Sequence, residues 1–207
     1  IGGGIAGISA AAKLSEVARV AVLEQEEVFG FHASGRSAAS YIPDYGNQTT
    51  RILNEFSLSE LQTLNGGVLT QRGLMMLGQR HQKGDFDQEM QSMGLELIDI
   101  VQAKRLLPIL NTKTVVFASY RGDIFDLDTN QLIQNYLSIC KRNNVTLLNN
   151  FKVKQIDFLS EKWLVRSSLT ELTSSKIVNA AGAWADQIAT MGGLKPIKLT
   201  PYRRSMA

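Results

Sequence analysis

Three glycines and one acidic residue are spaced as in a binding site for a dinucleotide. Gly2, Gly4 and Gly7 form the pattern G-x-G-x-x-G, and Glu24 stands about 20 residues further on. The first glycine permits a tight turn from strand to helix, the second leaves room for a pyrophosphate, and the third lets the helix pack against the sheet. The acid is placed to accept hydrogen bonds from ribose hydroxyls. No Arg or Lys follows Glu24 directly, which favours the adenosine of FAD or NAD over that of NADP.

The elements that this pattern requires are present around it. Small and apolar residues from Ala6 to Leu14 suit a helix that packs on a sheet, and residues 20–23 are typical of a buried parallel strand. A phosphate would then lie at the positive end of the helix. The alternative is a turn that binds no nucleotide, because glycine-rich turns also form for conformational reasons alone.

Two further segments of small residues could lie against a flat ligand. Residues 31–40 consist mostly of Ala, Ser and Gly around Arg36, whereas an ordinary surface loop would contain more Lys, Glu and Pro. Ala180, Ala181 and Gly182 follow an expected strand and leave space that larger side chains would fill. Tight packing of strand and helix without a ligand is the alternative for this second turn.

The composition is that of an ordinary globular chain. Of its 207 residues 44% are hydrophobic and 20% are charged. The net charge of +3 is small and the basic residues are scattered apart from the pair Arg203-Arg204, which does not support a nucleic-acid partner. The single Cys140 excludes an internal disulfide and favours a reducing compartment. No apolar segment is long enough to cross a bilayer. We expect a cytoplasmic location, with peripheral attachment to a membrane left open.

Metal binding is not expected. The only histidines, His32 and His81, belong to no cluster of ligands, and we expect both on the surface.

The order of expected elements places a different domain between nucleotide-binding segments. Residues 44–125 have the character of an α+β insertion. Asp128 is expected to cap a helix with an apolar face, after which strands return the chain to a sheet. We expect helices at 54–64, from Asp85 to 93, at 102–107 and after Asp128, and strands at 68–78, 95–100, 115–120, 145–148, 151–158, 163–167 and 176–180.

Three segments together resemble the FAD-dependent D-amino-acid oxidase superfamily, which includes glycine oxidase, sarcosine oxidase and D-amino-acid dehydrogenases. They are residues 1–7, 33–39 and 178–186. Residues 37–45, with tyrosines at 41 and 45, and residues 201–205 look closest to the D-arginine dehydrogenase branch.

The resemblance implies an α/β fold, with a Rossmann-like FAD-binding domain and an inserted α+β substrate domain. Only Ile1 precedes the first glycine, and no helix or strand closes the sequence, so we expect an amino-terminal fragment that is incomplete at both ends. The expected boundaries are 1–43 and 126–194 for the FAD-binding domain, 44–125 for the substrate domain, and 195–207 for the start of a second substrate-domain segment.

The same resemblance implies the residues that bind FAD. The glycine pattern would hold the pyrophosphate, Glu24 the ribose, the loop around Arg36 the ribityl chain and flavin, and the backbone of Val153 would meet the adenine. The expected cofactor-binding residues are Gly2, Gly4, Ile5, Ala6, Gly7, Glu24, Gln25, Ser34, Gly35, Arg36, Ser37, Ala38, Val153, Ala180, Ala181, Gly182 and Trp184.

For the substrate, Arg204 matches the position that binds a carboxylate in these dehydrogenases, and Tyr45 matches an active-site tyrosine. Two positions depart from the D-arginine pattern: Ser40 replaces a histidine and Leu74 replaces a glutamate. A cationic substrate would lose its charge partner at Leu74, so a neutral or apolar amino acid fits at least as well.

The implied reaction is oxidation of the C–N bond of a D-amino acid or secondary amino acid to an imine, which water converts to a keto acid and an amine or ammonia. The electron acceptor, whether oxygen, a quinone or a carrier protein, stays open. One alternative is an NAD-dependent Rossmann dehydrogenase, for which we find no Tyr-Lys or His pair. The other is a catalytically incomplete FAD-binding fragment or subunit, and we expect this segment alone to be inactive.

Overall fold

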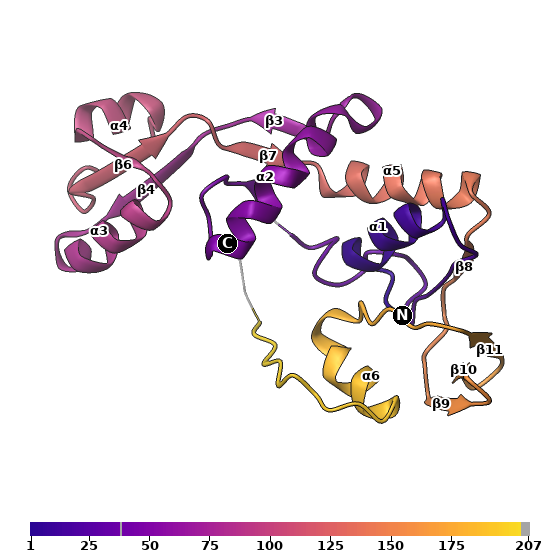
Figure 1. The fold of residues 1–207 in the computed structure, drawn as a ribbon. Helices are drawn as coiled ribbons and strands as arrows, with labels where there is room; N and C mark the ends of the chain where they lie inside the picture. The colour runs from indigo at the N-terminus through magenta and orange to yellow at the C-terminus, as the bar shows by residue number, and fades with distance from the viewer. Residues whose placement is uncertain (38, 204–207) are drawn as a thin grey trace. The chain divides into compact units, whose positions relative to one another are not determined.

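The computed structural model describes residues 1–37 and 39–203, which form two compact units. The first consists of residues 1–37 and 129–203, and the second of residues 39–128. Figure 1 traces the chain through its helices and strands. The domain boundaries that we expect from the sequence stay predictions.

A parallel sheet is the frame of the first unit. β1 (Ala21–Leu23) pairs in parallel with β8 (Thr146–Leu148). On the other side of β1, the amide of Gly2 donates to the carbonyl of Leu23 at 2.9 Å, and the amide of Ala180 donates to the carbonyl of Ile1 at 2.8 Å. Segments that are far apart in the sequence therefore meet side by side, as in a Rossmann-like sheet.

Two helices of the first unit pack on each other, as Figure 1 shows. α1 (Ile5–Leu14) buries Ile8, Ala11 and Ala12. α5 (Thr129–Arg142) buries an apolar face that ends at Cys140, whose sulfur lies 3.7 Å from the carbonyl oxygen of Ile8. A short 3-10 helix, η3 (Gly182–Trp184), leads into α6 (Ala185–Met191).

An antiparallel sheet of three strands completes the first unit. Its order is β11-β10-β9. Ile156 and Val165 pack with Leu23, Phe151 and Val153 in one core. The strands are β9 (Gln155–Leu159), β10 (Lys162–Arg166) and β11 (Glu171–Ser174).

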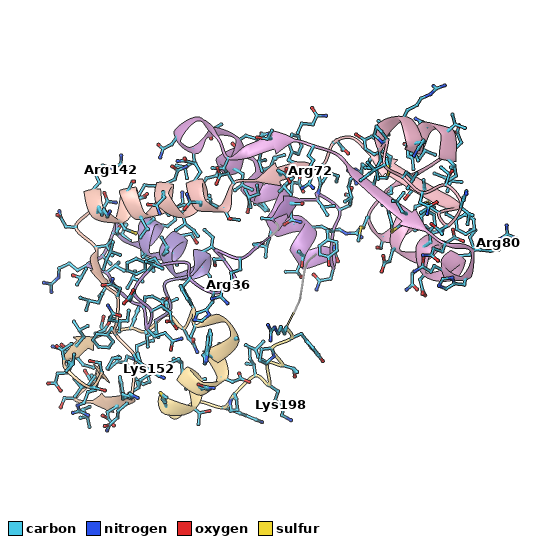
Figure 2. All side chains as sticks on the ribbon, turned by 180° about the vertical axis from the view of Figure 1, so that it is seen from behind. Arg36, Arg72, Arg80, Arg142, Lys152 and Lys198 are labelled. Carbon is cyan, nitrogen blue, oxygen red and sulfur yellow. The ribbon has the colours of Figure 1, made fainter. Side chains whose placement is uncertain are left out.

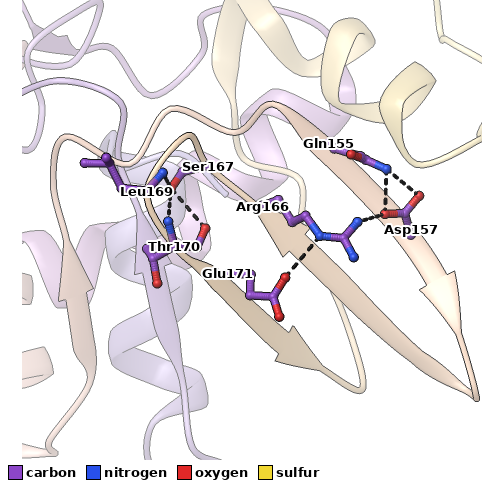
Figure 3. Close-up of polar contacts among 7 residues, drawn as sticks. All are labelled: Gln155, Asp157, Arg166, Ser167, Leu169, Thr170 and Glu171. Carbon is purple, nitrogen blue, oxygen red and sulfur yellow. Dashed lines mark hydrogen bonds and ion pairs between the residues drawn. The ribbon is translucent and has the colours of Figure 1, made fainter.

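Charged side chains link the three strands of this sheet. The guanidinium of Arg166 forms ion pairs with Asp157 on β9 and with Glu171 on β11, the latter at 3.1 Å (Figure 3). Gln155 donates from its amide nitrogen to both carboxylate oxygens of Asp157. One arginine thus ties both edge strands to the central one.

The second unit holds two antiparallel sheets and three α-helices among its described residues. The sheet orders are β2-β7-β3 and β4-β6-β5. Ala103, Leu110 and Ala118 form the centre of its apolar core. The elements are β2 (Ser40–Tyr41), α2 (Gln48–Thr63), η1 (Leu64–Gly66), β3 (Leu69–Gln71), β4 (Leu74–Gly78), η2 (Arg80–Gln82), α3 (Lys83–Ser92), β5 (Glu96–Ile98), α4 (Ile100–Leu106), β6 (Phe117–Arg121) and β7 (Phe125–Leu127).

The α/β fold class is confirmed, while several element boundaries differ from those expected. Asp85 lies in the first turn of α3 and does not cap it. Ile100 begins α4 instead of ending a strand, because the carboxylate of Asp99 accepts a hydrogen bond from the amide of Gln102 at 2.7 Å and caps that helix. The strand expected at 176–180 is wrong: these residues form no regular strand, and the strand lies earlier, at β11.

A search for membrane-spanning helices finds none of sufficient length and apolar character in residues 1–37 and 39–203.

Candidate dinucleotide-binding site

The glycine pattern forms a turn into which side chains would not fit. Gly2 has a φ of 108°, and a methyl group added there would lie 2.2 Å from the carbonyl oxygen of Ala180. A methyl group added at Gly7 would lie 1.9 Å from the carbonyl oxygen of Gly2. The first glycine therefore makes the turn, and the last lets α1 approach the strand before it.

At the amino end of α1, a backbone amide is hydrogen-bonded to a hydroxyl group of a loop that is distant in the sequence. The amide of Ile5 donates to Oγ of Ser34 at 2.9 Å. Gly4 precedes the helix, and a methyl group added there would lie 3.1 Å from the same Oγ. The first turn of α1 has no acidic residue, so the positive end of the helix dipole is available to an anion.

Glu24 is buried at the carboxyl end of β1, with only 7% of its surface exposed. Its Oε2 accepts a hydrogen bond from the amide of Gly3 at 2.7 Å, and its Oε1 accepts one from the amide of Glu26 at 2.9 Å. A carboxylate has about four acceptor positions, so about two of them remain for further hydrogen-bond donors. The two backbone bonds also fix the carboxylate beside the glycine turn.

A pocket of about 330 Å³ opens beside these groups, within the first unit. This volume lies in the range of roughly 300–1,000 Å³ that is typical of small-molecule sites. Of the residues predicted to bind the cofactor, those that line it are Gly2, Gly4, Glu24, Gln25, Ser34, Val153, Ala180, Ala181, Gly182 and Trp184. The structure therefore brings together segments that the sequence separates by more than a hundred positions.

Other predicted cofactor residues lie outside the lining of this pocket. Ile5, Ala6 and Gly7 form the first turn of α1. Gly35, Arg36 and Ser37 continue the loop, and the guanidinium of Arg36 lies 4.8 Å from the ring centre of Phe31 (Figure 2). Ala38 lies outside the described residues.

The predicted substrate residues do not belong to the described part of the first unit. Ser40 and Tyr45 belong to the second unit, where Ser40 pairs with Asp126 in the sheet. The side chain of Tyr45 is exposed at the end of a turn, in which its amide donates to the carbonyl of Ile42 at 3.2 Å. Arg204 lies outside the described residues.

Further residues that the sequence did not indicate also line the pocket, and among them His32, Lys152 and Gln187 have polar side chains. We expected His32 on the surface, and the structure shows its side chain half-buried. Its side chain is about one third exposed, its Nε2 lies 2.9 Å from Oε1 of Glu26, and its ring centre lies 4.6 Å from that of Trp184. The aromatic pair Phe31-His32 directly before the loop of small residues is the signal that could have indicated it.

Within the part of the chain that the structure describes, no three His, Cys, Asp or Glu residues gather as metal ligands would. The site is therefore built of backbone amides, one buried carboxylate and aromatic rings.

A model of the DAO family, described as FAD dependent oxidoreductase, matches residues 1–207. Among solved structures, glycine oxidase from Geobacillus kaustophilus is similar with a TM-score of 0.80 and 19% identity, over 94% of this chain and 57% of that one. L-alpha-Glycerophosphate oxidase from Mycoplasma pneumoniae with FAD bound gives 0.79 and 16%, over 93% and 55%. L-proline dehydrogenase from P. horikoshii gives 0.76 and 21%, over 96% and 55%. The chain thus spans about half the length of these structures, and the likeness shows a shared fold.

Proposed function

Because the chain belongs to the DAO family of FAD-dependent oxidoreductases and FAD is its cofactor, we propose that the full-length protein oxidises the C–N bond of a D-amino acid or a secondary amino acid. An amino-acid substrate is supported by two of the similar structures, which are named glycine oxidase and L-proline dehydrogenase. The D configuration rests on the resemblance of residues 37–45 and 201–205 to the D-arginine dehydrogenase branch, which stays a prediction.

The observation that carries the proposal is the pocket beside the glycine turn. Methyl groups at Gly2 and Gly7 would collide with backbone oxygens, so the turn is kept free of side chains, and α1 offers amides to a pyrophosphate. The buried carboxylate of Glu24 keeps acceptor positions for ribose hydroxyls. In this proposal Ser34 to Ala38 and Ala180 to Trp184 hold the remainder of FAD, and the backbone of Val153 meets the adenine.

When bound, FAD supplies the acceptor for a hydride. Arg204 would hold the substrate carboxylate with two parallel hydrogen bonds, and Tyr45 would line the substrate site. The Cα–H bond breaks with its electron pair leaving as hydride, while the amine nitrogen loses a proton and forms the C=N bond. Water then adds to the imine carbon, and the C–N bond breaks as the nitrogen takes up a proton, which releases ammonia or an amine and leaves a keto acid. A substrate that arrives with a neutral amine needs no strong base from the chain.

The substrate side chain is proposed to be neutral or apolar. Leu74 stands where the D-arginine dehydrogenase branch has a glutamate. It is half-buried in β4, where it pairs with Arg121. A cationic side chain would find no carboxylate at this position.

A second candidate is oxidation of a C–O bond. The similarity to L-alpha-glycerophosphate oxidase, whose named substrate contains no nitrogen, favours it. An NAD-dependent dehydrogenase is no longer a candidate, because the family is FAD-dependent. An inactive FAD-binding subunit stays an outcome of the experiment below.

The experiment is an anaerobic absorbance spectrum of the full-length protein with FAD, before and after the addition of each substrate. D-amino acids, L-proline, sarcosine, glycine and glycerol 3-phosphate would be compared. We expect the visible flavin bands to bleach with neutral D-amino acids or secondary amino acids. Bleaching by glycerol 3-phosphate alone would replace the proposal with alcohol oxidation, and a spectrum that no compound changes would favour the inactive subunit.

A matched pair of variants tests the role of Arg204. R204K keeps the charge but loses the two parallel bonds, so we expect KM to rise by about tenfold or more. R203K changes the neighbouring residue and should leave KM within about twofold of the wild-type value, because single exposed contacts contribute little. Equal effects of the two variants would argue against Arg204 as the carboxylate ligand.

A further inference from the structure

A line of ring contacts connects the loop after β1 to the turn before α6. The ring of His32 lies 4.6 Å from that of Trp184 at 54°, and 5.1 Å from that of Phe31 at 88°. These separations and angles are those of favourable aromatic pairs. Phe31 and Trp184 are far apart in the sequence, and the ring of His32 contacts both of them. It therefore joins the loop after β1 to the turn before α6.

A second set of contacts fixes His32 from the side of β1. Its Nε2 lies 2.9 Å from Oε1 of Glu26, and the amide of Glu26 donates to the carboxylate of Glu24 at 2.9 Å. Glu24, His32 and Trp184 all line the same pocket. The ring of His32 is thus held between the carboxylate of Glu26, whose amide binds the lining residue Glu24, and the indole of Trp184, which forms part of the pocket wall.

We infer that His32 is a positioning residue for FAD, which holds Trp184 in place as a wall of the nucleotide pocket. This inference rests on FAD as the cofactor and is independent of the proposed substrate. Trp184 ends η3, two residues after Gly182, whose φ is 52°, and its ring contacts that of His32. A site that is ordered before binding loses less entropy when the ligand arrives.

The test is the dissociation constant of FAD for the full-length apoprotein, followed by the quenching of flavin fluorescence. In H32A the ring contact and the bond to Glu26 are lost, and we expect the dissociation constant to rise about threefold to tenfold. H32F keeps a ring against Trp184 and loses only the bond to Glu26, so its value should lie between those of wild type and H32A. H81A is the matched control, because His81 is exposed in η2 of the second unit.

A double-mutant cycle tests whether His32 acts through Trp184. If it does, H32A should add little to the effect of W184A, because the ring that His32 holds is already absent. Full additivity of the two variants would overturn the inference, as would a dissociation constant of H32A equal to that of H81A. Thermal unfolding of each apoprotein separates a weaker site from a damaged fold. If H32A is unstable, an FAD dissociation constant of H32F between those of wild type and W184A would support the ring contact, and one equal to that of W184A would overturn it.

Discussion

Two helical glycines in this chain have opposite surroundings, and they give a matched test at the scale of single residues. Gly7 in α1 leaves no space, because a methyl group there would lie 1.9 Å from the carbonyl oxygen of Gly2. Gly84 in α3 has no atom within 4 Å of the same position. G7A should lower the free energy of unfolding by about 1–3 kcal/mol, since the helix must move away from the strand. G84A should raise it by up to about 1 kcal/mol, because alanine favours the helix.

Denaturant unfolding of the two variants measures this difference, and retention of FAD after gel filtration measures its effect on the site. G7A should lose FAD and G84A should keep it. If G7A unfolded like wild type and kept FAD, the close approach of α1 to the glycine turn would be wrong.

The residues of the site differ in how far the sequence could predict them. The places of Gly2 and Gly7 follow from backbone geometry, which is local and has a fixed spacing in the sequence. The neighbouring Phe31 could have indicated that His32 belongs to the site, but the contact of His32 with Trp184 joins residues far apart in the sequence and could not be predicted locally. Whether Arg204 and Tyr45 meet a substrate stays a prediction.

At the scale of elements, one arginine connects three parts of the second unit. Arg121 at the end of β6 donates to both carboxylate oxygens of Asp123, at 2.6 and 3.0 Å. Its Nη1 also donates to Asp44 at 2.6 Å and to the carbonyl of Met93 at 3.1 Å. The loop that carries Tyr45 and the end of α3 are therefore both tied to β6.

This cluster gives a pH dependence whose sign can be stated. The guanidinium of Arg121 lowers the pKa of Asp123 below its ordinary value of 3.8. The carboxylate therefore contributes its stability in full above pH 3.8, and the contribution is lost as the pH falls through the lower pKa of the folded state. The difference in the free energy of unfolding between wild type and D123N should shrink over this acidic range. In the R121M background the same substitution should show no such dependence, and an unchanged dependence would mean that another group lowers the pKa.

Elements with a strong apolar period could be predicted, and those defined by distant partners could not. α5 could be predicted because six of its residues are buried along one face. It begins directly after Asp128, as expected. α2 begins at Gln48, earlier than the expected residue 54. This start was missed because none of the helix residues is buried, and only the cap at Asn47 marks the beginning of the helix. β2 and β7 pair with each other across more than eighty residues and are too short to show a period of their own.

At the scale of the whole molecule, the first unit closes only when distant segments meet. Residues 1–3 lie between β1 and residues 178–180, and β8 lies on the other side of β1. The sequence predicted that the chain returns to a sheet, but the neighbours within that sheet depend on long-range pairing, which local patterns do not specify. The same pairing creates the candidate dinucleotide pocket, so we expect FAD binding and the folding of this unit to be linked.

Cys140 offers a direct measure of that linkage. It is the only cysteine of the sequence, its side chain is fully buried between α5 and α1, and burial raises the pKa of its thiol. Only an exposed thiolate reacts readily, so labelling requires the first unit to open. FAD at 100 times its dissociation constant stabilises the folded state by about 2.7 kcal/mol, which slows labelling about 100-fold when opening is at equilibrium. Mass spectrometry of the peptide that contains Cys140, after timed reaction with iodoacetamide, measures this rate. In G7A, which should not retain FAD, the cofactor should have no effect. A rate that FAD leaves unchanged in the wild-type protein would mean that α5 opens locally, without disturbing the pocket.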